Sequence, residues 1–82
     1  MRGQPKSDID LHVIGEVKKL RIEHGFSQAV LAVKLGVSDA FIGQIENPKN
    51  ISKYNLDQIN TLAQIFACSP KDFLPDKAII SK

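Results

Sequence analysis

The chain has few residues that could form a disulfide or bind a metal ion. Its 82 residues contain one cysteine, Cys68, two histidines and no tryptophan. A single thiol cannot close an intramolecular disulfide, and neither His12 nor His24 has neighbours at the spacing of a metal or catalytic site. We therefore expect no metal and no cofactor, a buried and unreactive thiol at Cys68, and a reducing, cytoplasmic location.

Long apolar runs are missing as well. No stretch approaches the roughly 20 apolar residues that a membrane-spanning helix needs, and the polar first residues lack the apolar segment of a secretory signal. The sequence also has no phosphate-binding glycine loop and no combination of nucleophile, base and orienting group. We therefore expect neither a membrane partner nor an enzyme.

The chain does contain enough apolar side chain for one small core. Hydrophobic residues make up 43% of it and charged residues 24%, a balance typical of a single globular domain at this length. The formal net charge of +2 does not by itself indicate a nucleic-acid partner. The placement of the basic residues permits a phosphate-facing surface, because several surround one segment: Lys18, Lys19, Arg21, Lys34, Lys49 and Lys53.

Apolar periodicity predicts an all-α fold. We expect a helical domain over residues 9–75, between a flexible lead-in at 1–8 and a short tail at 76–82. The spacing of apolar residues and of helix start and stop signals predicts helices at about 9–24, 28–35 and 39–46, a fourth opening at Asn55, and a final turn at about 70–74. The polar residues 47–54 are expected to form a loop.

A sharp turn is predicted between the second and third of these helices. Gly36 can adopt the left-handed conformation that ends a helix, and Ser38 is a favourable N-cap for the next one. Ile42 and Ile45 then fall on the inner side of the third helix, which leaves its outer face exposed. A short helix presented in this way fits the DNA major groove, which is about 12 Å wide.

The fourth helix should contribute much of the core. Asn55 and Gln58 are spaced almost as a capping box, and an apolar stripe of helical period follows: Leu56, Ile59, Leu62, Ala63 and Phe66. Ser69 and Pro70 favour the start of the final turn. The apolar tail residues Ala78-Ile79-Ile80 could either join the core or take part in a dimer contact.

Together these segments resemble the phage-repressor and Cro-like helix-turn-helix proteins, also called XRE-type regulators. The resemblance covers roughly residues 12 to 74 and is carried by Ile14-Gly15, Leu20-Arg21, Gly25-Phe26-Ser27-Gln28, Leu31-Ala32, Leu35-Gly36-Val37-Ser38, Ile42, Ile45-Glu46, Leu62-Ala63 and Cys68-Ser69-Pro70-Lys71-Asp72-Phe73-Leu74. It implies a compact five-helix, lambda-repressor-like DNA-binding domain. It also implies a regulator of transcription that binds double-stranded DNA sequence-specifically as a homodimer.

The resemblance further implies roles for individual residues. Base contacts are expected from the outward positions of the helix at 39–46, namely Asp39, Ala40, Phe41, Gly43 and Gln44. Phosphate contacts are expected from helix starts and from the loop that follows, namely Ser27, Gln28, Ser38, Lys49, Asn50 and Lys53. Arg21 and Glu46 match a structural salt bridge. Gln44 fits base reading best, because glutamine can pair with adenine for roughly 1 to 3 kcal/mol of discrimination.

The sequence departs from this family at the start of its third helix. Relatives usually place Gln, Arg, Ser or Thr at the first three outward positions, where this chain has Asp39-Ala40-Phe41. Asp39 would repel phosphate unless it accepts from cytosine or helps to cap the helix, and Phe41 suits a groove contact, a protein contact or a folding role. An alternative function is therefore a protein-interaction module, such as an antitoxin-like partner, with weak or no DNA binding.

Overall fold

The computed structural model describes residues 5–80, which form four α-helices and one short 3-10 helix. Their bounds are α1 Asp8–Glu23, α2 Gln28–Leu35, α3 Asp39–Glu46, α4 Leu56–Phe66 and η1 Pro70–Phe73. No strand occurs among the described residues. The predicted all-α class is confirmed, although the fifth of the five expected helices is a 3-10 helix of four residues.

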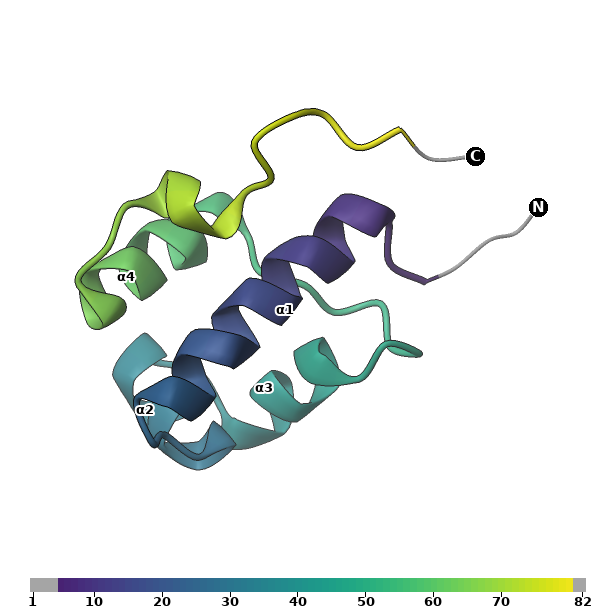
Figure 1. Ribbon diagram of the computed structural model, residues 1–82. Coiled ribbons are helices and arrows are strands. Elements are labelled where there is room, and N and C mark those ends of the chain that lie inside the picture. The colour runs from purple at the N-terminus through teal and green to yellow at the C-terminus, as the bar shows by residue number, and fades with distance from the viewer. Residues whose placement is uncertain (1–4, 81–82) are drawn as a thin grey trace.

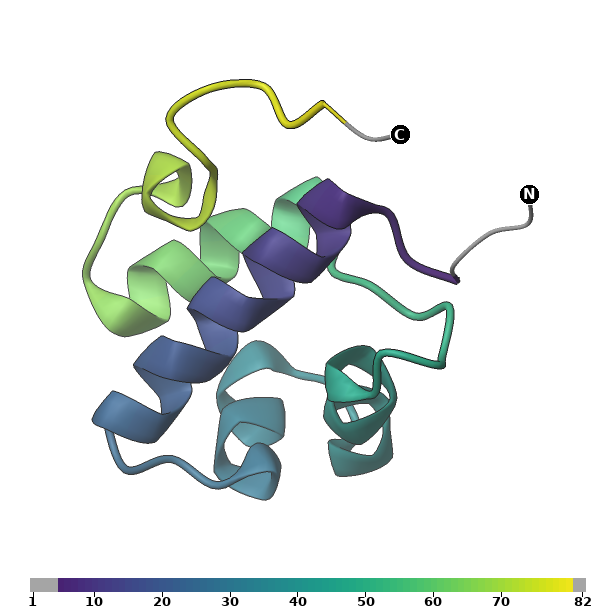
Figure 2. The same ribbon diagram turned by 45° about the vertical axis from the view of Figure 1, so that its right-hand side comes forward.

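Helix α1 runs through the middle of the molecule, as Figures 1 and 2 show. The pair α2 and α3 packs on one side of it, and α4 with η1 lies on the other side. Helix α2 also contacts α4, so the helices enclose one core. None of the described helices is long and apolar enough to cross a membrane.

Each helix begins at a side chain that accepts a hydrogen bond from a first-turn amide. These caps are Ser7 to Asp10 N (3.2 Å), Ser27 to Val30 N (3.1 Å), Ser38 to Phe41 N (3.1 Å), Asn55 to Gln58 N (2.7 Å) and Ser69 to Lys71 N (3.3 Å). Such a cap satisfies an amide that has no partner within its helix. The start of each helix is therefore determined by a capping residue close to it in the sequence.

Two of these boundaries bear directly on the predictions. Gly36 ends α2 with φ +81°, the left-handed conformation expected for it. Ser7 starts α1 at Asp8, so the end of the expected lead-in belongs to the helix and its cap. Residues 1–4 of that lead-in lie outside the described residues.

Apolar residues from every helix form the core. Those with no exposed area are Val17, Leu31, Ile42, Ile45, Leu62 and Phe73. The stripe expected on α4 is buried from Ile59 onward, but Leu56 is 86% exposed. Its inclusion in the predicted stripe was wrong, because Leu56 occupies the first position of α4 and lies at the rim of a hollow between α1 and α4. Ile80 is 87% exposed, so this tail residue lies outside the core.

Candidate nucleic-acid interface

Helix α3 buries one side and exposes the other. Ile42 and Ile45 have no exposed area, whereas Asp39, Ala40 and Gln44 are exposed. The inner side packs mainly on α2 and also contacts α1. Three of the five residues expected to contact bases therefore share the solvent side of one short helix.

The other two expected base contacts are half-buried. Phe41 packs against the core, which favours the folding role that the sequence left open. Gly43 lies where α3 approaches α2: a Cβ added there would lie 3.4 Å from Oε1 of Gln28. Both residues therefore lie where α3 packs against the rest of the molecule.

Asp39 takes part in starting α3. Its Oδ1 accepts a hydrogen bond from the backbone amide of Ala40 at 3.1 Å, beside the N-cap formed by Ser38. A carboxylate is favourable here because the first turn of a helix carries partial positive charge. Of the roles considered for Asp39, this geometry supports the capping role, while the side chain stays exposed to solvent.

A buried ion pair ties the end of α3 to α1. Arg21 Nε lies 2.9 Å from Glu46 Oε2, and Arg21 Nη2 lies 3.0 Å from Oε1. The two side chains are only 11% and 4% exposed. Arg21 Nη1 also donates to the backbone oxygen of Phe26 at 2.8 Å, which joins the turn before α2 to the same group. The pair implied by the resemblance is thus present, and it is bidentate.

Gln28 belongs to this cluster through its side chain. Its Nε2 donates to Oε1 of Glu46 at 3.0 Å, so the amide expected to reach a phosphate is held against α3. Its backbone amide lies in the first turn of α2, where amides have no intrahelical acceptor. The starts of α2 and α3 border an open hollow lined by Ser27, Gln28, Ala29, Asp39, Ala40 and Gly43. Sequence spacing gave no sign of the contact between Gln28 and Glu46.

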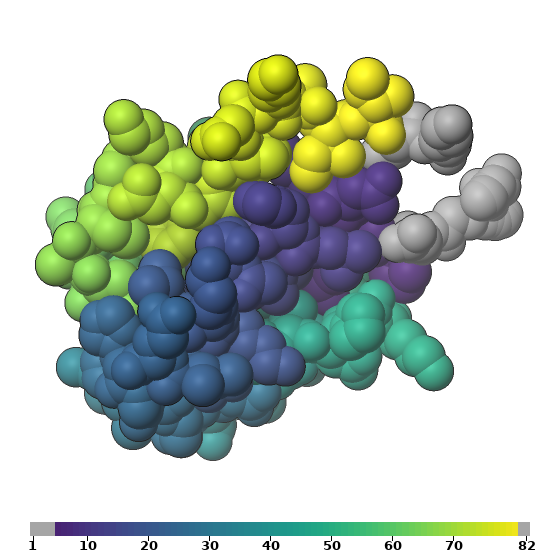
Figure 3. Space-filling model, in the orientation of Figure 1, coloured from purple at the N-terminus to yellow at the C-terminus, as the bar shows by residue number. Residues whose placement is uncertain are grey.

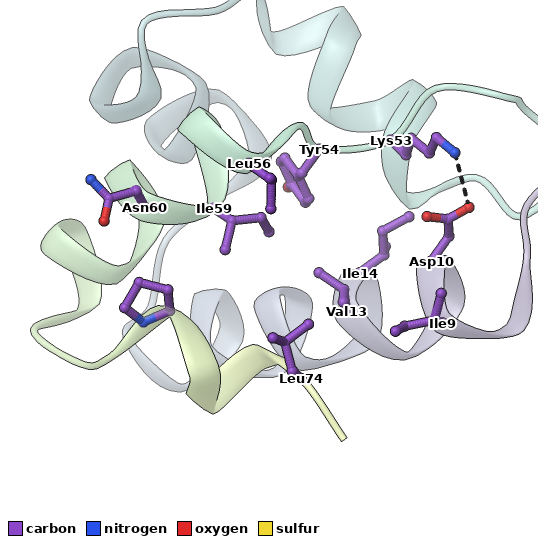
Figure 4. Close-up of a pocket in the computed structure, with 11 residues that line it drawn as sticks. Ile9, Asp10, Val13, Ile14, Lys53, Tyr54, Leu56, Ile59, Asn60 and Leu74 are labelled. Atoms are coloured by element: carbon purple, nitrogen blue, oxygen red, sulfur yellow. Dashed lines mark hydrogen bonds and ion pairs between the residues drawn. The ribbon is translucent and has the colours of Figure 1, made fainter. Parts of the chain in front are cut away.

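The three loop residues expected to contact phosphate differ in their exposure and in their bonds. Lys49 is exposed, and Asn50 is half-buried with its Oδ1 accepting from the amide of Ser52 at 2.8 Å. Lys53 is directed toward the start of α1, where its Nζ lies 3.3 Å from Oδ2 of Asp10 (Figure 4). Of these three residues, Lys49 is therefore the one whose side chain extends freely into solvent.

Lys6 is a residue of this region that sequence reasoning missed. Although it lies in the polar segment before α1, it is only 1% exposed. Its Nζ donates to the backbone oxygens of Gln44 at 3.4 Å and Asn47 at 2.6 Å, and also to that of Asn50. Burial lowers the pKa of Lys6, and the nearby Asp10 carboxylate offsets part of that effect. Nothing in the local sequence distinguishes this lysine from a solvated one.

A second hollow, of about 340 Å³, lies between α1, α4 and the segment after η1 (Figure 4). Its lining is mostly apolar and includes Ile9, Leu56 and Leu74. Tyr54 also lines it, but the phenol oxygen is buried and has no hydrogen-bond partner among the described residues. Burial raises the pKa of Tyr54, as does the charge of Glu46.

Chemically reactive groups are few in the described part of the chain. Cys68 is half-buried, and burial together with Asp72 raises the pKa of its thiol, which lowers the fraction of reactive thiolate. Within residues 5–80, no group of three or more His, Cys, Asp or Glu side chains could hold a metal ion.

Solved structures share this fold. The restriction-modification controller protein C.AhdI from Aeromonas hydrophila is 23% identical with a TM-score of 0.66, and the match covers 78% of this chain and 94% of that one. A transcriptional regulator of the HTH_3 family from Vibrio cholerae is 28% identical with a TM-score of 0.66, over 79% of this chain and 35% of that one. Hydroxypropylphosphonic acid epoxidase from S. wedmorenis is 20% identical with a TM-score of 0.72, over 94% of this chain and 44% of that one.

These likenesses differ in how much of each protein they cover. The chain spans nearly all of the controller protein but only about a third of the Vibrio regulator and under half of the epoxidase. The likeness to the epoxidase shows the fold alone and carries no activity over. A comparison with curated protein sequences gives no match.

A family model that matches the amino-acid sequence assigns the family. The helix-turn-helix family model HTH_3 matches residues 17–73, which is more than half of the chain. The matched segment contains α2, the turn at Gly36 and α3 in full. The chain therefore belongs to the helix-turn-helix family.

Proposed function

We propose that this chain binds double-stranded DNA sequence-specifically and regulates transcription, without catalysing a reaction, by placing α3 in the major groove. The observation that carries the proposal is the two-sided character of α3. Ile42 and Ile45 are fully buried on one side, while Ala40 and Gln44 are exposed on the other. A short helix held this way can enter a groove about 12 Å wide without losing its support.

Base reading is assigned to the solvent side of α3. Gln44 is the main candidate, because its side-chain amide can pair with the donor and acceptor of adenine. The Ala40 methyl suits a thymine methyl, and Asp39 can accept from cytosine at the start of the helix. Phe41 and Gly43 complete this face at its edge, where each is partly covered by packing.

Phosphate binding is assigned to the surroundings of α3. The hydroxyls of Ser27 and Ser38 and the backbone amide of Gln28 lie at helix starts, where the macrodipole favours an anion. Lys49 and Asn50 follow α3 in the loop. Lys53 is 59% exposed in its pair with Asp10, and such exposed pairs contribute little, so Lys53 can exchange the carboxylate for a phosphate.

The proposed functional unit on DNA is a homodimer. A dimer of this family type places its two recognition helices in successive major grooves, about 34 Å apart, and so binds a nearly palindromic site. The protein-interaction alternative has less support. Its main support was the triplet Asp39-Ala40-Phe41, and of these residues Phe41 is half-buried and packs against the core.

The experiment that tests the proposal is selection of bound sites from random duplex DNA. We expect an enriched, nearly palindromic sequence with half-sites about one helical turn apart. Gln44→Ala should change the enriched sequence, whereas Lys49→Ala should weaken binding to all sequences alike. Recovery of no enriched sequence from wild-type protein would contradict the proposed function.

A further inference from the structure

The end of α3 receives its positive charge from outside the helix. The C-terminal end of a helix leaves backbone oxygens without intrahelical partners and carries partial negative charge. Basic residues in the last turn commonly offset this charge. The last turn of α3 contains no basic residue, and Asn47 ends the helix in an extended conformation. The ammonium of Lys6 occupies this position instead, against the backbone oxygens of Gln44, Asn47 and Asn50.

The position of Lys6 is itself fixed by the start of α1. Ser7 and Asp10 form a reciprocal capping box, with Ser7 N donating to Asp10 Oδ2 at 3.1 Å and Asp10 N donating to Ser7 Oγ at 3.2 Å. The same Oδ2 of Asp10 pairs with Lys53 at 3.3 Å. The start of α1 therefore holds the segment between α3 and α4 at two points, through Lys6 and through Asp10.

The figures show the same arrangement. The segment before α1, in purple, lies beside the loop that follows α3, in teal, in both ribbon views (Figures 1 and 2). In the space-filling view the loop lies directly below the start of α1 (Figure 3). The loop that carries Lys49 and Asn50 is thus held by a distant part of the chain. Lys6 and Asn50 are 44 positions apart in the sequence.

We propose that Lys6 is a positioning residue for DNA recognition, whose ammonium fixes the end of α3 relative to the loop that follows it. The inference rests on the proposed function. Gln44 supplies a base contact and one of the oxygens that Lys6 holds, so its backbone and the loop bearing Lys49 are set by one cation. Because Lys6 is 1% exposed, its charge acts on these oxygens and does not contact phosphate.

The test uses Lys6→Met, which keeps most of the length of the side chain but removes its donors. Lys71→Met is the matched control, because it removes the same charge from an exposed position on η1. Affinity is measured for the selected duplex and for a scrambled duplex of equal length, at several salt concentrations. We expect Lys6→Met to weaken binding to the selected duplex about tenfold, comparable to one lost base contact, and to weaken binding to the scrambled duplex by a clearly smaller factor, because displacement of the loop bearing Lys49 affects both duplexes.

A second measurement needs no DNA. In wild-type protein the amide of Asn47 donates to Gly43 O at 3.1 Å and that of Asn50 to Asn47 O at 3.0 Å. We expect Lys6→Met to speed hydrogen exchange at both amides, while the amide of Gly36, bonded to Ala32 O at 2.8 Å, exchanges as before. Lys71→Met should change none of the three rates.

The outcomes separate this inference from the proposed function. If wild-type protein binds DNA but Lys6→Met keeps the ratio of selected to scrambled affinity, the inference is overturned and the proposed function stands. Equal loss of both affinities, with faster exchange at all three amides, would show a general loss of stability and would also overturn it. If wild-type protein binds no DNA, both fall, and the exchange rates still report whether Lys6 holds α3.

Discussion

The side-chain amide of Gln28 and the carboxylate of Glu46 are joined by a hydrogen bond of 3.0 Å between Nε2 and Oε1. The same Oε1 accepts from Nη2 of Arg21, also at 3.0 Å. One carboxylate therefore connects the start of α2, the end of α3 and helix α1. Gln28 thus contributes to the angle between the two helices of the helix-turn-helix, in addition to any contact its backbone makes with phosphate.

Gln28→Glu should destabilise the fold at neutral pH. The new carboxylate would replace a donor with a like charge against Glu46, and we expect a loss of about 1 to 3 kcal/mol in the free energy of unfolding at pH 7. The loss should shrink below about pH 4, where carboxyl groups become protonated. Urea unfolding at both pH values measures this. The exposed control Gln64→Glu should change stability by less than about 0.5 kcal/mol, and equal stability of both variants at pH 7 would disprove the contact.

Arg21→Met should destabilise the protein strongly. It leaves Glu46, whose side chain is 4% exposed, without its charged partner, and breaking a buried pair costs about 3 to 5 kcal/mol. The double variant Arg21→Met with Glu46→Met should recover part of this loss, because neither charge is then buried alone. Thermal or urea unfolding of the three proteins measures it. A single variant as stable as wild type would contradict the role given to this pair.

Signals close together in the sequence predicted the helix-turn-helix well. The bounds 28–35 and 39–46 agree with the structure because Ser27, Gly36 and Ser38 act on backbone groups only a few residues away. The pairing of Arg21 with Glu46 is a contact across 25 residues, and it was available only through the resemblance to a family.

Other features could not be predicted, because they depend on how distant segments pack. The contact between Gln28 and Glu46 spans 18 residues, and those of Lys6 span 38 to 44. A lysine in a polar segment is ordinarily solvated, so its sequence context favoured exposure. Leu56 fits the helical period of its stripe, but the period does not reveal that the first turn of α4 overhangs a hollow.

The stability that Asp10 provides should depend on pH in the acid range. Burial alone would raise the pKa of Asp10, but hydrogen bonds from Ser7 and the ammonium of Lys53 outweigh it and lower the pKa. A lowered pKa in the folded state means that the ionised form stabilises the fold. This contribution is complete above the ordinary pKa of about 4 and is lost as the pH falls through the folded-state value.

The measurement is the difference in unfolding free energy between wild type and Asp10→Asn from pH 2 to pH 6. We expect the difference to be largest above about pH 5 and to shrink as the pH falls through the lowered folded-state pKa of Asp10. Asp76→Asn, at an exposed position, is the control and should change the free energy of unfolding by less than about 0.5 kcal/mol. A difference for Asp10→Asn that does not vary with pH would contradict the proposed pairing of this carboxylate.

Tyr54→Phe should leave the protein as stable as wild type or make it slightly more stable. The phenol oxygen is buried and has no partner among the described residues, so it is desolvated without a compensating hydrogen bond. Removing it should change the free energy of unfolding by between zero and about 1 kcal/mol in the stabilising direction. Urea unfolding checks this, and a clear loss of stability would show that the hydroxyl makes a stabilising contact.

The central claim is that the solvent side of α3 binds DNA, and its most direct test is a titration of the selected duplex over a range of salt concentrations. We expect the logarithm of the binding constant to fall linearly with the logarithm of salt concentration. We also expect Lys49→Met to reduce this slope by about 1, and Gln44→Ala to reduce the preference over scrambled duplex by about tenfold, the loss of one base contact. Absence of binding at low salt, or binding that neither substitution alters, would contradict the account.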